Sequence, residues 1–225
     1  MRPLLSALAL LSSPLALAAE PATPSKPVVL EVEFKGGSAP AGSHPLAATD
    51  MKVSASSQLC EGKGKKRVCH GAERLVDRDG ATAWCEGAAK DGTGESVTFE
   101  FPSPQELVAV DVVPYYAKDM RRAMGNARPK AVALYVDAQR YELTFPDHPA
   151  RVFEENRSEP PDTSEGPCGD ETCTTQDERI NWAEHYRVKL PAPAKVQKVR
   201  LELLSTYEGD DHPDTCMSSV TFHVR

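Results

Sequence analysis

The sequence has no excess of positive charge, since 26 lysine and arginine residues stand against 33 aspartate and glutamate residues and give a formal net charge of −7. Such a chain has no global positive field to attract phosphate backbones, so we exclude nucleic acid as a partner. Long helices are also disfavoured, because 19 prolines and 14 glycines favour turns and argue against an all-helical bundle. After the N-terminal segment no stretch of about 18 residues is apolar throughout, which predicts no transmembrane segment in the mature chain.

The motifs of common enzyme classes are missing too. The sequence contains no Gly-x-Ser-x-Gly turn, no His-Glu-x-x-His helix and no glycine-rich phosphate loop. Glu86 and Glu95 are two acids near strand ends, and such acids are more typical of turn capping or of the surface than of a glycosidase pair. We therefore predict a protein without catalytic activity.

What is present begins with a secretion signal. Arg2 supplies a positive start, residues 4–17 form an apolar run too short to span a bilayer, and Ala16 and Ala18 precede a cleavage position. We therefore expect export to the periplasm or the extracellular space. The predicted organisation is a signal peptide at 1–18, a leader or linker at 19–50 with one strand at 28–34, and one domain at 51–225.

Export indicates that the six cysteines form disulfides, because an oxidising compartment favours them and an even number can pair completely. Two pairs, Cys60 with Cys69 and Cys168 with Cys173, bracket short loops and are expected as local bonds. Cys85 and Cys216 remain for each other. A zinc site is disfavoured, because the sequence has no Cys-x-x-Cys pair and His70 has no partner at ligand spacing.

The chain beyond residue 51 alternates between short apolar runs and turn residues. Alternation with a period of two is typical of half-buried strands, and the regular punctuation by proline and glycine favours an antiparallel β-sandwich over βαβ units. No convincing amphipathic helix is present. The expected strands of this all-β domain lie at residues 96–101, 107–113, 131–136, 141–145, 186–190, 199–204 and 219–224.

Two charged insertions interrupt this rhythm. The first, inside the Cys60/Cys69 loop, carries Lys63, Lys65, Lys66 and Arg67, and the second, residues 147–184, is acidic and proline-rich. Both are more typical of solvated loops than of core. The alternative for the basic insertion is contact with an anionic ligand, and together the two could dock a protein partner.

An acidic turn precedes Trp84, which we expect to anchor the core. Asp77, Asp79 and the Thr82 hydroxyl fall within one tight loop and could hold a structural calcium ion. An EF-hand beginning at Asp77 is excluded, because that motif needs glycine where Thr82 stands. The alternative, which the chemistry favours, is an Asp-Gly turn whose carboxylates cap backbone amides.

Several segments, taken in order, resemble one known family, the NADase-type glycan-binding domain of discoidin-like, coagulation factor V/VIII type C architecture. The resemblance implies a jelly-roll β-sandwich of the galactose-binding-domain-like type, with no glycohydrolase activity. Arg78 and Ser219 depart from the family pattern, and the second departure weighs against calcium. The matching segments are Asp77-x-Asp79-x-x-Thr82-x-Trp84, Cys85-Glu86-Gly87, Gly94-Glu95, Tyr116-Ala117-Lys118, Asn126-Ala127-Arg128-Pro129-Lys130, Tyr207-Glu208-Gly209 and Asp214-Thr215-Cys216-Met217-Ser218.

The resemblance implies glycan binding through loops at one end of the sandwich. Aromatic faces stack on sugar rings there, while arginine, asparagine and acids bind hydroxyl groups. For Arg128 the alternative is a structural ion pair at a strand entry, and for the whole protein it is a secreted protein-interaction module that uses its charged insertions. The candidate glycan-binding residues are Tyr115, Tyr116, Lys118, Asn126, Arg128 and Tyr207.

Overall fold

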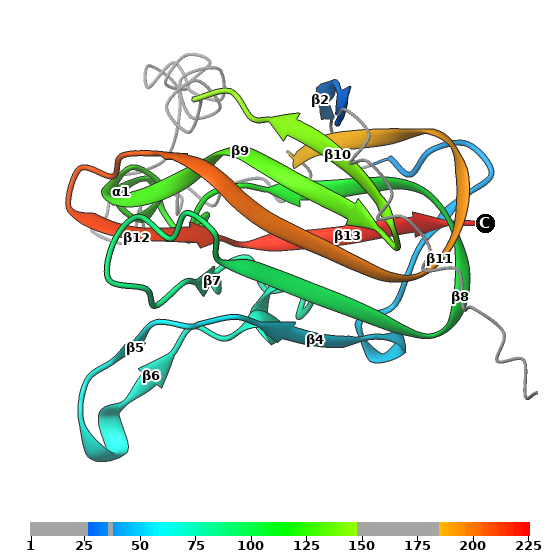
Figure 1. Cartoon of the computed structure of the whole chain (residues 1–225). Helices are drawn as coiled ribbons and strands as arrows, with labels where there is room; N and C mark the ends of the chain where they lie inside the picture. Colours follow the sequence, from blue (N-terminus) through cyan, green and yellow to red (C-terminus); the bar gives the residue numbers. More distant parts are fainter. Residues whose placement is uncertain (1–26, 36–37, 148–184) are drawn as a thin grey trace, which may run out of the picture.

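The computed structural model describes residues 27–35, 38–147 and 185–225 (Figure 1). The predicted signal peptide, the pair Cys168 and Cys173, and the acidic insertion beyond Asp147 lie outside these residues. The strands are β1 (Val28–Leu30), β2 (Val32–Lys35), β3 (His44–Pro45), β4 (Lys52–Ala55), β5 (Cys60–Glu61), β6 (Val68–Cys69), β7 (Trp84–Cys85), β8 (Ser96–Val113), β9 (Asn126–Val136), β10 (Gln139–Thr144), β11 (His185–Tyr207), β12 (His212–Met217) and β13 (Ser219–Val224). The helical segments are η1 (Ala48–Asp50), η2 (Gly64–Lys66), η3 (Ala72–Leu75) and α1 (Met120–Gly125).

The predicted all-β fold is confirmed, and all seven strands expected beyond residue 51 are found. Two pairs of them are fused, because residues 96–101 and 107–113 both belong to β8, and 186–190 and 199–204 both belong to β11. The first half of β8 pairs with the second half of β11 and with β4, whereas its second half pairs with the first half of β11 and with β13. The two long strands therefore run through both layers of the sandwich.

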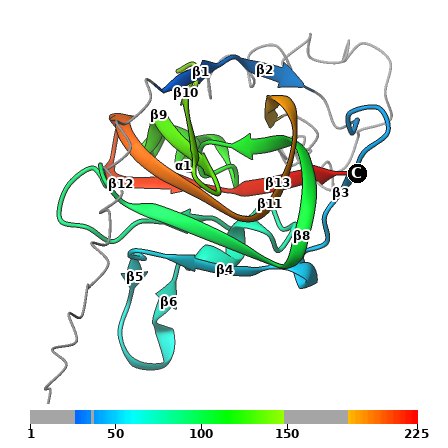
Figure 2. The same ribbon diagram turned by 45° about the vertical axis from the view of Figure 1, so that its right-hand side comes forward.

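Prolines mark the place where these long strands turn back. The ladder between β8 and β11 shifts register between Lys189 and Ala194, a stretch that includes Pro191 and Pro193, and Pro102 and Pro104 lie between the two paired halves of β8. Proline cannot donate to a ladder and is tolerated at such irregularities. Figures 1 and 2 show both strands curving at the same end of the molecule, opposite α1.

The core lies between the two layers and is built from the inward residues of each. Phe222 of β13 packs edge-on against Phe99 and Phe101 of β8, with ring centroids 4.9 and 5.3 Å apart. Trp84 is fully buried, as predicted, and its indole donates to the carbonyl of Ser57 at 3.0 Å. Edge-to-face pairs add to the stability that burial of the rings provides.

The N-terminal segment belongs to the sheet rather than to a separate leader. The expected strand at 28–34 is divided at Glu31, and its halves pair with different partners: β1 runs parallel to β10, and β2 runs antiparallel to β11. Leu46, in the predicted linker, donates its amide to the carbonyl of Phe222. The sheet is thus mostly antiparallel, with parallel pairs at β1/β10 and β12/β9.

Two predicted disulfides are confirmed. Cys60 bonds Cys69 across the β5–β6 hairpin, and Cys85 of β7 bonds Cys216 of β12, where the two strands pair. Within the part of the chain described here, no helix is both long and apolar enough to cross a membrane.

Candidate functional site

A cavity of about 240 Å³ opens at the loop end of the sandwich, opposite the end where β8 and β11 turn. It is formed where the base of the β5–β6 hairpin, the α1 segment and the turn before β12 meet over the Cys85–Cys216 disulfide. The lining is polar and carries both signs of charge. It comprises Leu59, Glu61, His70, Cys85, Tyr116, Arg121, Arg122, Asn126, Asp211, His212 and Asp214.

His70 is the most buried ionisable side chain of this wall, with 6% of the residue exposed. Backbone hydrogen bonds fix its position, since its amide donates to the carbonyl of Leu59 and its carbonyl accepts from the amide of Cys85. Its Nε2 atom lies 3.3 Å from a carboxylate oxygen of Glu61. Its Nδ1 atom is buried and has no hydrogen-bond partner among the described residues. A buried polar atom without a partner is costly, and it marks His70 as a residue that the fold alone does not explain.

Tyr116 supplies the aromatic surface of the cavity. Its ring meets the ring of His70 edge-on, with centroids 5.9 Å apart, and the guanidinium of Arg122 lies 5.9 Å from the ring centroid. Burial raises the pKa of the Tyr116 hydroxyl, although Arg122 and Arg74 oppose the shift. The phenol is therefore neutral at physiological pH, and its hydroxyl donates to the carbonyl of Ala81 at 3.4 Å.

The α1 segment holds the basic side of the cavity. Asp119 caps the helix by accepting the amide of Arg122 at 2.8 Å, and it also accepts the guanidinium of that residue. Asn126 donates its side-chain amide to the carbonyl of Arg122 at 2.9 Å. Arg121 is exposed and enters no ion pair with a described residue, so its guanidinium is available.

The acidic side comes from the turn between β11 and β12. Asp211 donates its amide to the carbonyl of Gly125, which brings the turn against α1. The close approach requires Gly209, because a Cβ atom there would lie 2.4 to 2.5 Å from the backbone of Asn126 and its neighbours. Asp211 and Asp214 thus line the same cavity as Arg121, so that acceptors and a donor for hydroxyl groups are both present in its wall.

The structure brings two of the six candidate glycan-binding residues into the cavity, Tyr116 and Asn126. Lys118 is exposed beside it without lining it. Tyr115 is buried in the main core. Tyr207, half-buried, donates its hydroxyl to the carbonyl of Phe145 and has the ammonium of Lys130 over its ring.

Arg128 takes a structural position. Its side chain is buried, and its guanidinium binds Asp147 at 2.7 Å and donates to the carbonyl of Met124 at 3.3 Å. These contacts match the ion pair at a strand entry that the sequence offered as the alternative.

The acidic turn before Trp84 caps its own backbone. Asp77 accepts the amide of Asp79 and the hydroxyl of Thr82, each at 2.8 Å, and Asp79 accepts the amide of Ala81 at 2.9 Å. These are the contacts of an Asp-Gly turn whose carboxylates cap backbone amides, and a calcium ion at this turn stays a prediction. No group of three or more histidine, cysteine, aspartate or glutamate residues among the described residues is arranged to hold a metal.

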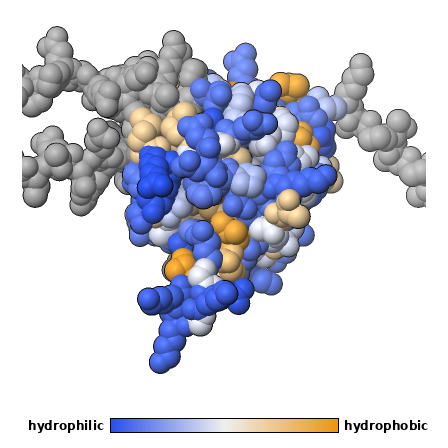
Figure 3. Space-filling model, turned by 90° about the vertical axis from the view of Figure 1, so that its left-hand side faces the viewer, coloured by the Kyte–Doolittle hydropathy of each residue, from blue (hydrophilic) through white to orange (hydrophobic). Residues whose placement is uncertain are grey.

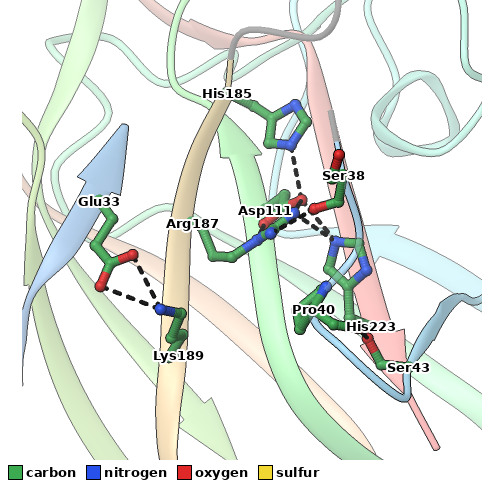
Figure 4. Close-up of polar contacts among 9 residues, drawn as sticks. All are labelled: Glu33, Ser38, Pro40, Ser43, Asp111, His185, Arg187, Lys189 and His223. Carbon is green, nitrogen blue, oxygen red and sulfur yellow. Dashed lines mark hydrogen bonds and ion pairs between the residues drawn. The ribbon is translucent and has the colours of Figure 1, made fainter. Parts of the chain in front are cut away.

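A second polar cluster, which the sequence did not reveal, lies where β8, β11 and β13 run side by side (Figure 4). Asp111 of β8 binds Arg187 of β11 through both carboxylate oxygens at 2.7 Å, and Nε2 of His185 and of His223 lies 2.7 and 2.6 Å from Oδ2. Burial alone would raise the pKa of Asp111, but the hydrogen bonds from Arg187, His185 and His223 outweigh it and hold that pKa well below its usual range. The cluster ties three strands together.

Residues that complete the cavity were missed by sequence reasoning. Arg121 and Arg122 stand between Tyr116 and Asn126, so their place in a matched loop was a usable signal. No such signal was present in the sequence for Asp211 and His212. They come close to Asn126 and the rest of the lining because β12 pairs with β9.

Comparisons with known proteins identify a matching family and several solved structures of similar fold. A family model described as the NAD glycohydrolase translocation F5/8 type C domain matches residues 47–223. No curated protein matches the sequence. Among solved structures, two carbohydrate-binding domains of Clostridium perfringens ZmpB, in complex with GalNAc, share the fold with a TM-score of 0.51, 10% identity, and coverage of 90% of this chain and 42% of that chain. An F5/8 type C domain from Bacteroides fragilis gives a TM-score of 0.49 and 16% identity, with coverage of 83% of this chain and 99% of that chain. The family 32 carbohydrate-binding module of C. perfringens NanJ, in complex with galactose, gives a TM-score of 0.47 and 12% identity, with coverage of 80% of this chain and 98% of that chain.

Proposed function

Because the chain belongs to the NAD glycohydrolase translocation F5/8 type C domain family, we propose that it is a non-catalytic glycan-binding module of an exported protein, with the loop-end cavity as its sugar site. The observation that carries this proposal is the composition of the cavity wall. It joins one aromatic ring, Tyr116, to donors and acceptors that are not all used by the fold. The ZmpB domains, solved with GalNAc, support a sugar as the class of ligand.

The size of the cavity limits what it holds. At about 240 Å³ it is smaller than the pockets of roughly 300 to 1,000 Å³ that enclose drug-sized ligands. It therefore suits one sugar unit rather than an oligosaccharide. The ring of Tyr116 would contact the apolar face of the sugar with the imidazole of His70 beside it, the guanidinium of Arg121 would donate to hydroxyl oxygens, and Asp211 would accept from hydroxyl groups.

A glycan array tests this function. The full chain, expressed with its own leader, is compared with His70→Ala, Arg121→Ala and the matched control Lys118→Ala, a change of an exposed cation outside the cavity. We expect retention of a defined set of glycans, about tenfold weaker binding by the first two variants, and no change in the control. Arg121 is exposed, so its loss leaves folding intact even if His70→Ala destabilises the protein. Absence of glycan binding, or full binding by both cavity variants, would refute the proposal.

The protein-interaction alternative keeps one observation in its favour. Lys63, Lys65 and Lys66 are exposed and make no ion pair with any residue that the structure describes. A pull-down from the exported fraction discriminates the two functions. A single stoichiometric protein partner together with a silent glycan array would favour the alternative.

A further inference from the structure

The β5–β6 hairpin projects from the loop end as a narrow arm (Figures 1 and 2). The Cys60–Cys69 disulfide closes its base, and η2 forms its tip. Gly62 has a φ of +77°, and a Cβ atom there would lie 2.5 Å from the carbonyl oxygen of Lys66, so only glycine fits the turn. The disulfide at the base and this glycine turn together define the path of the chain into the tip.

This arm contributes nothing to the core. Every residue from 61 to 68 is exposed, and none belongs to a hydrophobic cluster. Figure 3, which faces the loop end, shows the projection at the bottom of the molecule covered by hydrophilic side chains. Residues 61–68 therefore add no buried apolar surface to the fold, and packing does not explain why the arm projects from it.

The tip concentrates positive charge on a protein that is negative overall. Lys63, Lys65, Lys66 and Arg67 occupy four of five consecutive positions, while the whole chain carries a net charge of −7. None of the four pairs with an acid among the described residues. Like charges this close repel one another, and an anionic partner would remove that repulsion.

The arm is continuous with the wall of the sugar cavity. Leu59, Glu61 and His70, at its base, all line the cavity. Leu59 donates to the carbonyl of Cys85, His70 donates to Leu59, and Cys85 donates to His70, so the base is hydrogen-bonded to the strand that carries the disulfide. Glu61 lines the cavity and Lys63 follows it two positions later, so the basic tip begins directly at the cavity rim.

Charge is divided between cavity and tip. In the cavity the acids Glu61, Asp211 and Asp214 outnumber Arg121 and Arg122, so an anionic group is not favoured there, whereas the tip carries positive charge alone. Building on the proposed function, we propose that the ligand is an acidic glycan whose neutral terminal sugar enters the cavity while carboxylate or sulfate groups on the following units bind Lys63, Lys65 and Lys66. The tip is then the determinant that separates acidic glycans from neutral ones.

An anionic membrane surface fits the tip less well. Membrane-binding loops combine cations with apolar side chains that enter the bilayer, but residues 62–67 are all glycine, lysine or arginine. Val68, the exposed apolar residue of the arm, lies at its base in β6. The shared wall between hairpin and cavity instead favours a ligand that spans both.

Matched glycan pairs test the proposal. The full chain is compared with the triple variant Lys63→Gln, Lys65→Gln, Lys66→Gln and with a control of equal charge change at the opposite end, Lys52→Gln, Lys195→Gln, Arg225→Gln. Each protein is titrated with an oligosaccharide carrying uronic acid or sulfate and with the same oligosaccharide after carboxyl reduction or desulfation. The pairs are taken from the glycans retained on the array.

We expect the tip variant to bind the acidic member about tenfold more weakly at low salt and the neutral member equally well, with no effect in the control. In 1 M NaCl, where the Debye length is about 3 Å, the difference should disappear. Unchanged affinity of the tip variant for the acidic member, or an effect of the tip confined to vesicles with anionic lipid, would overturn the proposal. If no glycan of either kind binds any of the proteins, the proposed function itself fails; if acidic and neutral glycans bind and both are insensitive to the tip, that function stands and this inference alone is removed.

Discussion

Cys85 and Cys216 are bonded to each other although 131 positions separate them, and the bond joins β7 to β12 directly beneath the cavity. A covalent tie over so long a loop restricts the unfolded chain and also fixes the distance between two walls of the candidate site. Stability and binding are therefore linked at this bond.

Replacing Cys85 and Cys216 together by serine should lower the free energy of unfolding by as much as about 5 kcal/mol on the loop-entropy model and should weaken glycan binding as well. The control is Cys60→Ser with Cys69→Ser, whose bond closes a short loop and should cost about 2.5 kcal/mol. Urea denaturation of the three proteins makes the comparison. An equal loss in both double variants would contradict the assigned role of the long-range bond.

The Asp111 cluster should control acid stability. Asp111→Asn leaves the buried guanidinium of Arg187 without its counter-charge, and breaking a buried pair in this way costs about 3 to 5 kcal/mol. Because the pKa of Asp111 is depressed in the folded state, its contribution is complete above the unfolded pKa of about 3.9 and is lost as the pH falls below it. The variant should therefore lose stability at neutral pH and show a flatter decline towards pH 3.

Glu33→Gln provides the control for that measurement. Glu33 binds Lys189, but both side chains are substantially exposed, so the change should cost less than about 1 kcal/mol. If the free energy of unfolding of Asp111→Asn depended on pH as that of the wild type does, the Asp111 carboxylate would not be the source of the acid sensitivity.

Arg128 is expected to stabilise the fold rather than to bind the ligand directly. Arg128→Ala removes the donor to Met124 and the partner of Asp147, and loss of such partners costs about 1 to 3 kcal/mol. Glycan affinity measured well below the melting temperature should be unchanged. Unchanged stability with weakened binding would instead return Arg128 to the sugar site.

The strands could be predicted because their signal is local. Apolar and polar residues alternate in residues 96–101 of β8 and in β13, and the alternation indicates which face is buried. The short helix α1 escaped detection, because six residues cannot display a helical period. Its N-cap, Asp119, is visible only once the backbone is known.

The candidate site was predicted only in part, because its geometry is set by tertiary contacts. Tyr115 and Tyr116 are chemically alike neighbours, yet one packs in the main core and the other lines the cavity. The acidic wall is absent from sequence reasoning for the same reason, since Asp211 reaches α1 only through the backbone contact to Gly125. Composition indicates which residues could bind a sugar, and packing decides which of them can reach it.

Glu86 should have the opposite pH dependence to Asp111. Its fully buried carboxylate accepts the amides of Ala88 at 2.6 Å and Thr215 at 3.1 Å and so joins the segment after β7 to β12. Burial raises the pKa of Glu86, and the nearby Asp214 and Glu95 add to the shift although the two amides oppose it. The stability it contributes is therefore complete below its unfolded pKa of about 4.3 and is lost as the pH rises through the folded pKa.

Glu86→Gln tests this sign. The amide keeps one acceptor oxygen but places an NH₂ group against one of the two backbone amides, which should cost about 1 to 3 kcal/mol. The difference in unfolding free energy between wild type and variant, measured by urea denaturation from pH 4 to pH 8, should be largest at the acid end and shrink as the pH rises. Because Asp111 is present in both proteins, its own titration cancels in this difference. A difference that grows with pH would mean that the ionised carboxylate, and not the neutral acid, is the form that the fold stabilises.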